Sequence, residues 1–343
     1  MKFLVVGDTH YTKDNVNEIN MMENELDRLI TKHKPDQIVF LGDTLDKNHK
    51  IDMGSQQRAQ NYLNKLSQTH DIILLVGNHD RYNNNDFLSP NHPFSGMECR
   101  SRVTVVADVI VKSFKDGAED IRVCCVPYVP KGRFMEAIKT KVQNPDIDVD
   151  VYFAHQDFSR IAGRGDEWPL EYPEVISGHI HKKYYKKGDN IIYPGAPLCH
   201  NFGDDADRYV LIYDIQVIDG ELVLGYIWEK LDVPSKIKRS VILPMTKQDE
   251  IELKEFLKGR LAQYTKLDVT GQQHAIDEFR GIYGHQAAIT PNYVGLIPDK
   301  DPELDDISDY RFVDLLADEL DDLELTKDAH KKALERLRTT LAI

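Results

Sequence analysis

Metal-ligand side chains follow five short apolar runs of this 343-residue chain, at the point where each run ends. They belong to Asp8, His10, Asp43, Asn78, His79, His155, His179 and His181. Carboxylate, imidazole and amide groups in this mixture suit hard or borderline divalent metal ions. Two such ions roughly 3.5–4 Å apart can hold the attacking and the leaving oxygen of an in-line displacement at phosphorus. The residue types therefore predict a binuclear metal centre.

The joint pattern carries more weight than any of its pieces. Alone, the sequence Asp8-Thr9-His10 is most often part of a loop that binds no metal. Gly-His-Ile-His at 178–181 supplies two metal ligands in only a minority of proteins that contain it. Five of the 13 histidines, however, fall in this array. The other eight are interpreted as ordinary polar or surface residues: His33, His49, His70, His92, His200, His274, His285 and His330.

The apolar runs are predicted to be buried strands of an α/β sheet. They cover residues 3–6, 38–41, 74–76, 151–154 and 175–177. Amphipathic helices are predicted at 16–33 and 54–69, from apolar residues at helical spacing. This alternation indicates parallel strands joined by crossover helices, and ligands bind at the carboxyl ends of such strands. A glycine before Asp8, Asp43, Asn78 and His179 lets the backbone approach closely there.

The order of these blocks resembles the pattern of a known family. Asp-x-His, Gly-Asp, Gly-Asn-His-Asp, a lone His and Gly-His-x-His occur here in the order found in calcineurin-like metallophosphoesterases. Within that superfamily the chain is most similar to the SbcD / Mre (meiotic recombination eleven) DNA-repair nuclease subunit, including the shorter phage-type relatives. A Pro-Gly-Ala-Pro turn at 194–197 and a strand-like run at 207–214 point to the same branch. The resemblance implies a four-layer α-β-β-α sandwich with a small α/β cap and C-terminal helices.

The resemblance also assigns roles to the predicted site residues. Asp8, His10, Asp43 and His181 would hold one ion, and Asp43, Asn78, His155 and His179 would hold the other. Asp43 is the expected bridge, because a carboxylate offers two oxygens. His79 would stabilise the transition state or protonate the leaving oxygen, with Asp80 orienting its ring. The share of histidine favours manganese, iron or zinc over Mg²⁺, which prefers oxygen ligands, and Mn²⁺ is the expected ion.

The resemblance implies a metal-dependent DNA exonuclease or endonuclease that works with an SbcC-like ATPase, and as a homodimer, in recombination, repair or phage DNA processing. One alternative is a phosphodiesterase for small molecules such as cyclic nucleotides or nucleotide esters. Another is a non-catalytic scaffold, although the complete set of ligand types argues against it. After Asp43 the chain lacks the Pro-Ser pair of its relatives, in a region that often contributes to the dimer and to the DNA path.

An irregular segment at 81–98 lies directly beside His79 and contains three consecutive asparagines and two prolines. Long structureless loops in compact domains are often functional. We expect this loop to contact substrate, with Arg81, Tyr82 and His92 as phosphate or base contacts. The alternative is a surface excursion without a role.

The chain is predicted to have three parts: a nuclease domain at 1–233, a cap-like α/β domain at 234–298 and an acidic helical segment at 299–343. The second part should contain a helix at 247–264 and a loop from residue 284.

The acidity of the chain is concentrated in one segment. Residues 299–328 hold 13 acidic and three basic side chains, which is most of the net charge of −14. The first part is therefore much less acidic than the whole chain, and DNA stays its expected partner. The stripe of Phe312, Leu316 and Leu320 should dock on the ATPase or pack on its own domain.

The cysteines and the hydrophobic runs suggest a compartment. The four cysteines form no Cys-x-x-Cys pair, and no apolar run approaches the ~20 residues of a membrane span. We expect an intracellular, cytoplasmic protein of a bacterial or phage-infected cell, neither secreted nor bound to a membrane.

Overall fold

The computed structural model describes residues 1–48, 50–116, 119–202 and 204–294, and these divide into two compact units. One unit comprises Met1–Arg239, Lys254–Leu267 and His285–Ala288. The other comprises Ser240–Leu253, Asp268–Gly284 and the chain from Ile289. Every predicted site residue belongs to the first unit. None of the described helices combines the length and the apolar character needed to cross a membrane.

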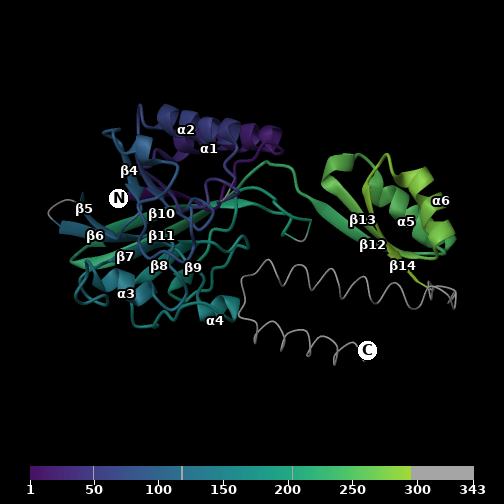
Figure 1. The fold of residues 1–343 in the computed structure, drawn as a ribbon. Helices are drawn as coiled ribbons and strands as arrows, with labels where there is room; N and C mark the ends of the chain where they lie inside the picture. Colours follow the sequence, from purple (N-terminus) through teal and green to yellow (C-terminus); the bar gives the residue numbers. More distant parts are fainter. Residues whose placement is uncertain (49, 117–118, 203, 295–343) are drawn as a thin grey trace, which may run out of the picture. The chain divides into compact units, whose positions relative to one another are not determined.

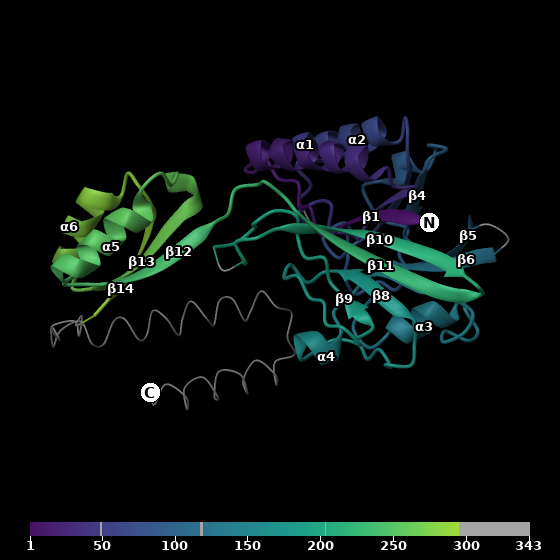
Figure 2. The same ribbon diagram turned by 180° about the vertical axis from the view of Figure 1, so that it is seen from behind.

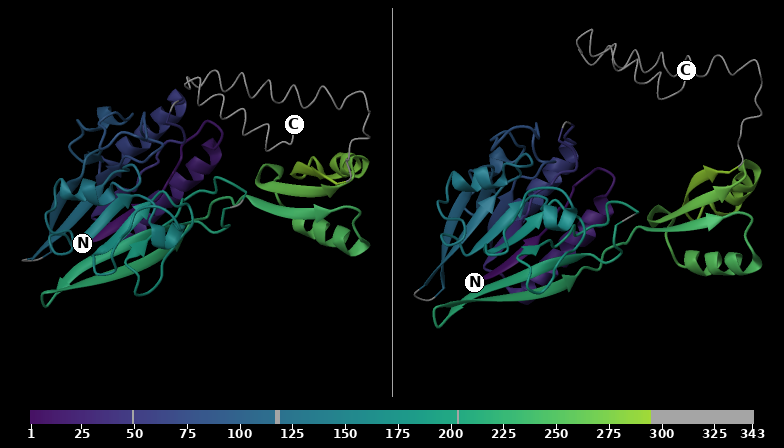
Figure 3. Two further views of the ribbon diagram at one scale, coloured as in Figure 1. Left: turned by 60° about the horizontal axis from the view of Figure 1, so that its bottom comes forward. Right: turned by 90° about the horizontal axis from the view of Figure 1, so that it is seen from below.

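Two sheets form most of the first unit (Figure 1). The six-stranded sheet, in the order β11-β10-β1-β2-β3-β4, contains β1 (Lys2–Val6), β2 (Gln37–Phe40), β3 (Asp71–Leu75), β4 (Val103–Val106), β10 (Tyr209–Ile218) and β11 (Glu221–Lys230). The five-stranded sheet, in chain order, contains β5 (Ile110–Asp116), β6 (Glu119–Val126), β7 (Val151–His155), β8 (Glu174–Gly178) and β9 (Ile191–Ile192). β1 to β4 and β6 to β9 pair in parallel. The long β10–β11 hairpin extends the six-stranded sheet at one edge (Figure 3).

Alternate residues of the central strands face two different cores. On β1, Phe3 packs between the sheets, whereas Leu4 packs on the helices. Val39 of β2 and Phe153 of β7 enter the core between the sheets from its two sides. Because the side chains of a strand alternate between its two faces, a sheet made of such continuous apolar runs is buried on both sides.

Helices cover the outer faces of both sheets (Figure 2). α1 (Val16–His33) and α2 (Met53–Leu66) pack on the six-stranded sheet, and α3 (Phe134–Lys139) and α4 (Ser159–Ala162) lie against the other. α1 buries Ile19, Met22, Leu26, Leu29 and Ile30, as their helical spacing predicts. α2 begins after Asp52, whose carboxylate accepts the backbone N–H of Ser55 at 2.8 Å, a stabilising N-cap. The predicted four-layer α-β-β-α sandwich is confirmed.

A separate three-stranded sheet, in the order β12-β13-β14, follows along the chain. Its strands are β12 (Ile237–Ile242), β13 (Thr265–Gly271) and β14 (Ala288–Tyr293), and its helices are α5 (Lys247–Leu257) and α6 (Gln273–Tyr283). α5 is shorter than the predicted helix and stops shortly before Gly259, which adopts a φ of +70°. The prediction of a loop from residue 284 is wrong for β14. The predicted helices of the acidic segment lie outside the described residues.

Candidate metal centre

The predicted site residues lie at the carboxyl ends of five strands that come from both sheets. β1 leads to Asp8 and His10, β2 to Asp43, β3 to Asn78 and His79, β7 to His155, and β8 to His179 and His181. Their ligand atoms form two groups, each within 4.8 Å: Asp8 with His10 and His181, and Asp43 with His155 and His179. The fold therefore brings these residues together from distant parts of the sequence.

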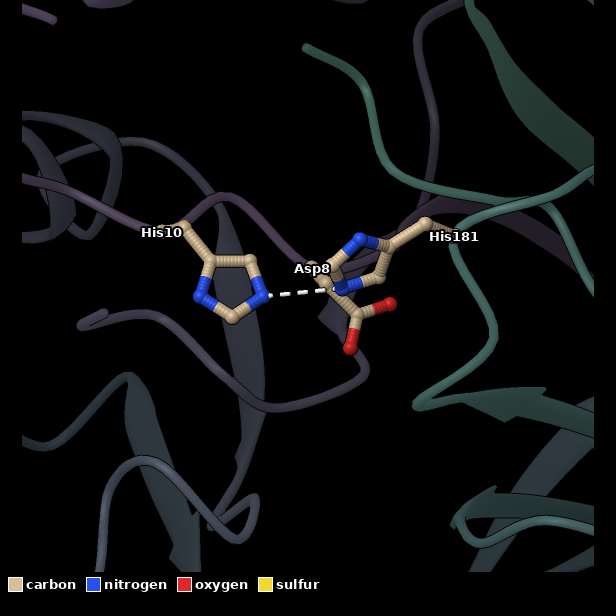
Figure 4. A group of neighbouring side chains, drawn as sticks. All are labelled: Asp8, His10 and His181. Carbon is tan, nitrogen blue, oxygen red and sulfur yellow. Dashed lines mark hydrogen bonds between the residues drawn. The ribbon is translucent and has the colours of Figure 1, made fainter. Parts of the chain in front are cut away.

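The first group consists of Asp8, His10 and His181 (Figure 4). The Nε2 atoms of the two histidines lie 3.1 Å apart, with the Asp8 carboxylate beside them. Asp8 Oδ1 accepts the backbone N–H of His179 at 2.8 Å, whereas Asp8 Oδ2 is buried without a hydrogen-bond partner in the described part of the chain. Burial lowers the pKa of His10 well below its usual value, so its ring is neutral. An unpaired buried carboxylate oxygen next to two imidazole nitrogens fits a divalent cation.

The second group consists of Asp43, His155 and His179, with Asn78 among them. Asn78 Oδ1 lies 3.0 Å from His155 Nε2 and 2.7 Å from His179 Nδ1. His155 Nδ1–H donates to the backbone oxygen of Leu41 at 2.7 Å, so Nε2 faces the group. Two imidazoles, an amide oxygen and a carboxylate thus converge, a set of ligands that suits manganese, iron or zinc.

Asp43 lies between the two groups. Its Oδ2 is 3.3 Å from His155 Nε2 and 3.9 Å from His10 Nε2. Its Oδ1 accepts the backbone N–H of His79 at 2.7 Å. Burial acts to raise the pKa of Asp43, but the surrounding histidines hold it below its usual range, so the side chain is an anion. One anionic carboxylate within reach of both groups is what a bridge between two ions requires.

The Asp43 carboxylate also sets the charge of His155. Burial alone would lower the pKa of this imidazole, but Asp43, together with Asp8, raises it to about 9. For His179, burial and the neighbouring His155 lower the pKa. In metal-free protein the second group is therefore a buried ion pair of Asp43 and protonated His155, next to a neutral His179.

The backbone around these side chains is restricted. His10, Asp43 and His179 adopt positive φ angles of 45°, 47° and 77°. Such angles are uncommon for residues with a side chain and cost on the order of 1–3 kcal/mol each. At Gly77 a Cβ atom would lie 2.2 Å from Asp43 Oδ1, so a larger residue cannot occupy that position without displacing Asp43. Strain at three candidate ligand positions is typical of a functional site.

His79 lies beside the two groups, with its side chain 40% exposed. Its Nδ1–H donates to the backbone oxygen of Asp46 in a short hydrogen bond. Its Nε2 lies 4.0 Å from Asp43 Oδ2. The ring is therefore aimed at the centre by the backbone of the loop after β2, while Nε2 makes no hydrogen bond within the described part of the chain.

Asp80 has other hydrogen-bond partners than the predicted His79 ring. Its buried carboxylate accepts the backbone N–H groups of Thr44, Leu45 and Gly77 at 3.0, 2.8 and 3.2 Å. Burial and the nearby Asp43 raise the pKa of Asp80, and the three N–H donors oppose that rise. The prediction that Asp80 orients the His79 ring is wrong, because its oxygens are used to join the loops that follow β2 and β3.

Two rings that the sequence did not single out pack against the centre. His200, predicted to be an ordinary polar or surface residue, is partly buried, and its ring centroid lies 4.6 Å from that of His10 and 5.1 Å from that of His181. Tyr128, which follows β6, stacks on His179 at a centroid distance of 5.9 Å. His200 comes soon after the Pro-Gly-Ala-Pro turn, the one sequence signal near it, and no local pattern marks Tyr128.

Only one of the three residues predicted to contact substrate in the loop after His79 is exposed. Arg81 is 2% exposed, and its guanidinium donates to the backbone oxygens of Tyr128 and Asp86. The His92 side chain is 1% exposed and pairs with Glu98. The prediction that Arg81 and His92 contact substrate is wrong, because both side chains hold the loop itself in place. Tyr82, by contrast, is 72% exposed.

A cavity of about 420 Å³ opens on the first group and is lined in part by His10, His79, His181 and His200. Its other charged residues are Asp14, Glu18, Asp46 and Lys236, so the cavity is not basic. A neighbouring cavity of about 320 Å³ shares Asp46 with it and includes Lys13, Lys47 and Lys50. Three further lysines therefore lie next to the centre, in a cavity that also carries Asp14, Asp46 and Asp52.

The chain is similar to known proteins in sequence and in structure. The model of the family described as calcineurin-like phosphoesterase matches residues 1–206. The chain is 32% identical over 285 residues to protein 078R of Invertebrate iridescent virus 3, covering 81% of this chain and 78% of that protein. It is 28% identical over 264 residues to protein 244L of Invertebrate iridescent virus 6, covering 74% and 87%. A solved phosphatase from Mycoplasma pneumoniae is similar over 68% of this chain and 95% of that one, at 12% identity and a TM-score of 0.39.

Proposed function

Because the chain belongs to the calcineurin-like phosphoesterase family, we propose that it hydrolyses phosphodiester bonds of DNA through two divalent metal ions. The observation that carries the proposal is the position of Asp43, whose carboxylate lies within reach of both ligand groups. A shared anion lets two ions sit close enough to act on one phosphate. The likeness of the sequence blocks to those of the SbcD / Mre nuclease subunits supports DNA as the substrate.

The two groups would hold one ion each. The first ion would bind Asp8, His10, His181 and Asp43, and the second Asp43, Asn78, His155 and His179. Mn²⁺ ions bound there would supply Lewis-acid polarisation of the phosphate and activation of a water molecule. Contacts outside the ligand set fix the direction of the ligands, as the Leu41 backbone oxygen does for His155.

His79 would act as the proton donor to the leaving oxygen. The hydrogen bond from Nδ1–H to the Asp46 backbone oxygen holds the ring while Nε2 faces the centre. A proton on Nε2 can then pass to the oxygen whose bond to phosphorus breaks. Because the side chain is 40% exposed, bulk water can restore that proton after each turnover.

We also propose that an SbcC-like ATPase is a partner, bound through the acidic segment 299–343. The support comes from the sequence alone: Phe312, Leu316 and Leu320 recur at helical spacing in a segment that is otherwise strongly acidic. A helix of this kind gains stability when its apolar face is laid into a groove of a partner.

The test of the substrate is a side-by-side assay of Mn²⁺-loaded protein on linear DNA and on cyclic nucleotides. We expect cleavage of DNA that a chelator and the Asp43→Ala variant both abolish. His274→Ala is the matched control, because this histidine is exposed on α6 and lies outside the first unit. Turnover of cyclic nucleotides without cleavage of DNA would instead identify a small-molecule phosphodiesterase. Two bound ions without turnover of either substrate would identify a scaffold.

A further inference from the structure

His200 lies against the first ligand group, but its Nε2 is already used. This nitrogen is 3.2 Å from the backbone oxygen of Asp8, and because a carbonyl oxygen only accepts, Nε2–H is the donor. His200 belongs to neither group of convergent ligand atoms in the described part of the chain. Its ring packs on both ligand rings, at interplanar angles of 73° to His10 and 60° to His181. His200 is therefore placed to support the ligand residues and not to bind the ion itself.

The backbone of His200 is itself held from two sides. Its N–H donates to Asp204 Oδ2 at 2.8 Å, and its carbonyl oxygen accepts from Lys236 Nζ at 2.9 Å. Hydrogen bonds to charged groups are stronger than those between neutral groups. The buried Arg208 donates to the backbone oxygen of His181 at 3.2 Å and so steadies the loop on the other side of the ring. His200 therefore has a fixed place beside the loops that follow β1 and β8.

Within the described part of the chain, His10 lacks a hydrogen-bond acceptor of the kind that fixes His155. A histidine that binds metal usually donates its second ring N–H to an acceptor, which fixes the ring. His155 has this acceptor in the backbone oxygen of Leu41. His10 Nδ1 is buried without a hydrogen-bond partner in the described residues, and the Asp46 carboxylate lies 3.6 Å away. The His10 ring is therefore held by packing on His79, on His181 and, at the shortest centroid distance of 4.6 Å, on His200.

We propose that His200 is a positioning residue for the first metal ion. It holds the loop of Asp8 through its Nε2–H and the ring of His10 through packing, so it raises the affinity of the first group for its ion. The second group makes no contact of this kind with His200 in the described residues and should not respond to its loss. The inference rests on the proposed two-metal function but concerns binding and not turnover.

The test is calorimetric titration of metal-free protein with Mn²⁺. Wild type should bind two ions per chain. His200→Ala should bind the first about 10–100-fold more weakly, the usual effect of removing a support of a metal ligand, and the second unchanged. His200→Gln keeps an N–H donor, His200→Phe keeps a ring, and each should recover part of the lost affinity. His274→Ala should match wild type.

Double variants assign the weakened ion. His155→Ala removes a ligand of the second group, so the remaining ion reports on the first, and adding His200→Ala should weaken it. His181→Ala removes a ligand of the first group, and adding His200→Ala there should cause no further loss. Two ions bound to His200→Ala with wild-type affinity would overturn the inference, as would equal weakening of both. Wild-type protein that binds no Mn²⁺ would overturn the metal centre itself, whereas two ions bound without DNA cleavage would overturn only the substrate.

Discussion

The Asp43 carboxylate faces the His10 and His155 rings with one oxygen and accepts the His79 backbone N–H with the other. Its loss should therefore disturb both ligand groups at once. We expect Asp43→Ala to lose most of both Mn²⁺ ions, and Asp43→Asn, which keeps one oxygen, to lose less. Metal analysis of protein reconstituted with Mn²⁺ and then desalted measures this. Two ions retained by Asp43→Ala would contradict the bridge.

His79 should be separable from metal binding, because its free Nε2 lies outside both groups of convergent ligand atoms in the described residues. We expect His79→Ala to keep two ions and to lose phosphodiester cleavage by about 10²–10⁴-fold, the usual contribution of a positioned acid. Parallel metal analysis and DNA cleavage assays decide this. Loss of an ion along with activity would make His79 a ligand instead.

Proton release should accompany binding to the second group. The pKa of His155 is raised to about 9, so at neutral pH the metal-free ring carries a proton that a cation must displace. Affinity for this ion should therefore rise with pH until about pH 9 and level off above it. Near pH 7.5, titrations in two buffers of different ionisation enthalpy should differ by about one proton released per ion. A buffer-independent heat would refute the Asp43–His155 ion pair.

At the scale of single residues, the predicted ligand positions were within reach of the sequence because each is local: an apolar run, often a glycine, and then a polar residue. His200 and Tyr128 follow no such pattern, since only the packing of separate loops brings their rings to the centre. Arg81 and Asp80 were misjudged for a related reason. Their partners are backbone groups of distant residues, and a sequence does not display those.

Among the elements, the loops after β2 and β3 depend on one side chain. Asp80→Ala would leave the N–H groups of Thr44, Leu45 and Gly77 without their acceptor. A buried donor without a partner costs about 1–3 kcal/mol, so we expect a loss of about 3 kcal/mol or more in the free energy of unfolding. Asp80→Asn should lose less, because one oxygen remains.

Urea denaturation of metal-free protein, followed by tryptophan fluorescence, measures this loss. Both tryptophans, Trp168 and Trp228, belong to the first unit, so the signal reports on the part that carries Asp80. Asp120→Ala, at an exposed site, is the control and should change stability by less than about 0.5 kcal/mol. A stability loss in Asp80→Ala no larger than in this control would contradict the role of Asp80.

Elements with a continuous apolar pattern could be predicted, and polar edge elements could not. β1, β2 and α1 show their burial directly in their sequences. β14 is an edge strand that contains Pro291 and Asn292, and both residue types are depleted in strands. Its conformation comes from pairing with its neighbour, a contact between segments that are distant in the sequence.

At the scale of the whole molecule, the candidate ligands end at His181, far before the acidic segment that begins at residue 299. We expect a chain truncated after Pro298 to stay soluble, to bind two Mn²⁺ ions and to cleave simple phosphodiesters. The same truncation should abolish binding to an SbcC-like ATPase, because it removes the Phe312, Leu316 and Leu320 stripe. Pull-down of both forms against the ATPase measures this. Equal binding would refute docking, and aggregation of the short form would show that the stripe packs on the protein's own core.

The two sheets of the first unit share contacts across their common rim. His155 of the five-stranded sheet donates to Leu41 beyond β2, and Asp8 beyond β1 accepts from His179 of the other sheet. Any slide of one sheet over the other strains both contacts at once. Residues packed between the sheets, such as Phe3 and Phe153, whose rings lie 5.3 Å apart, therefore help to align the candidate ligands. We therefore expect metal affinity at the candidate centre to fall when a core substitution shifts one sheet against the other.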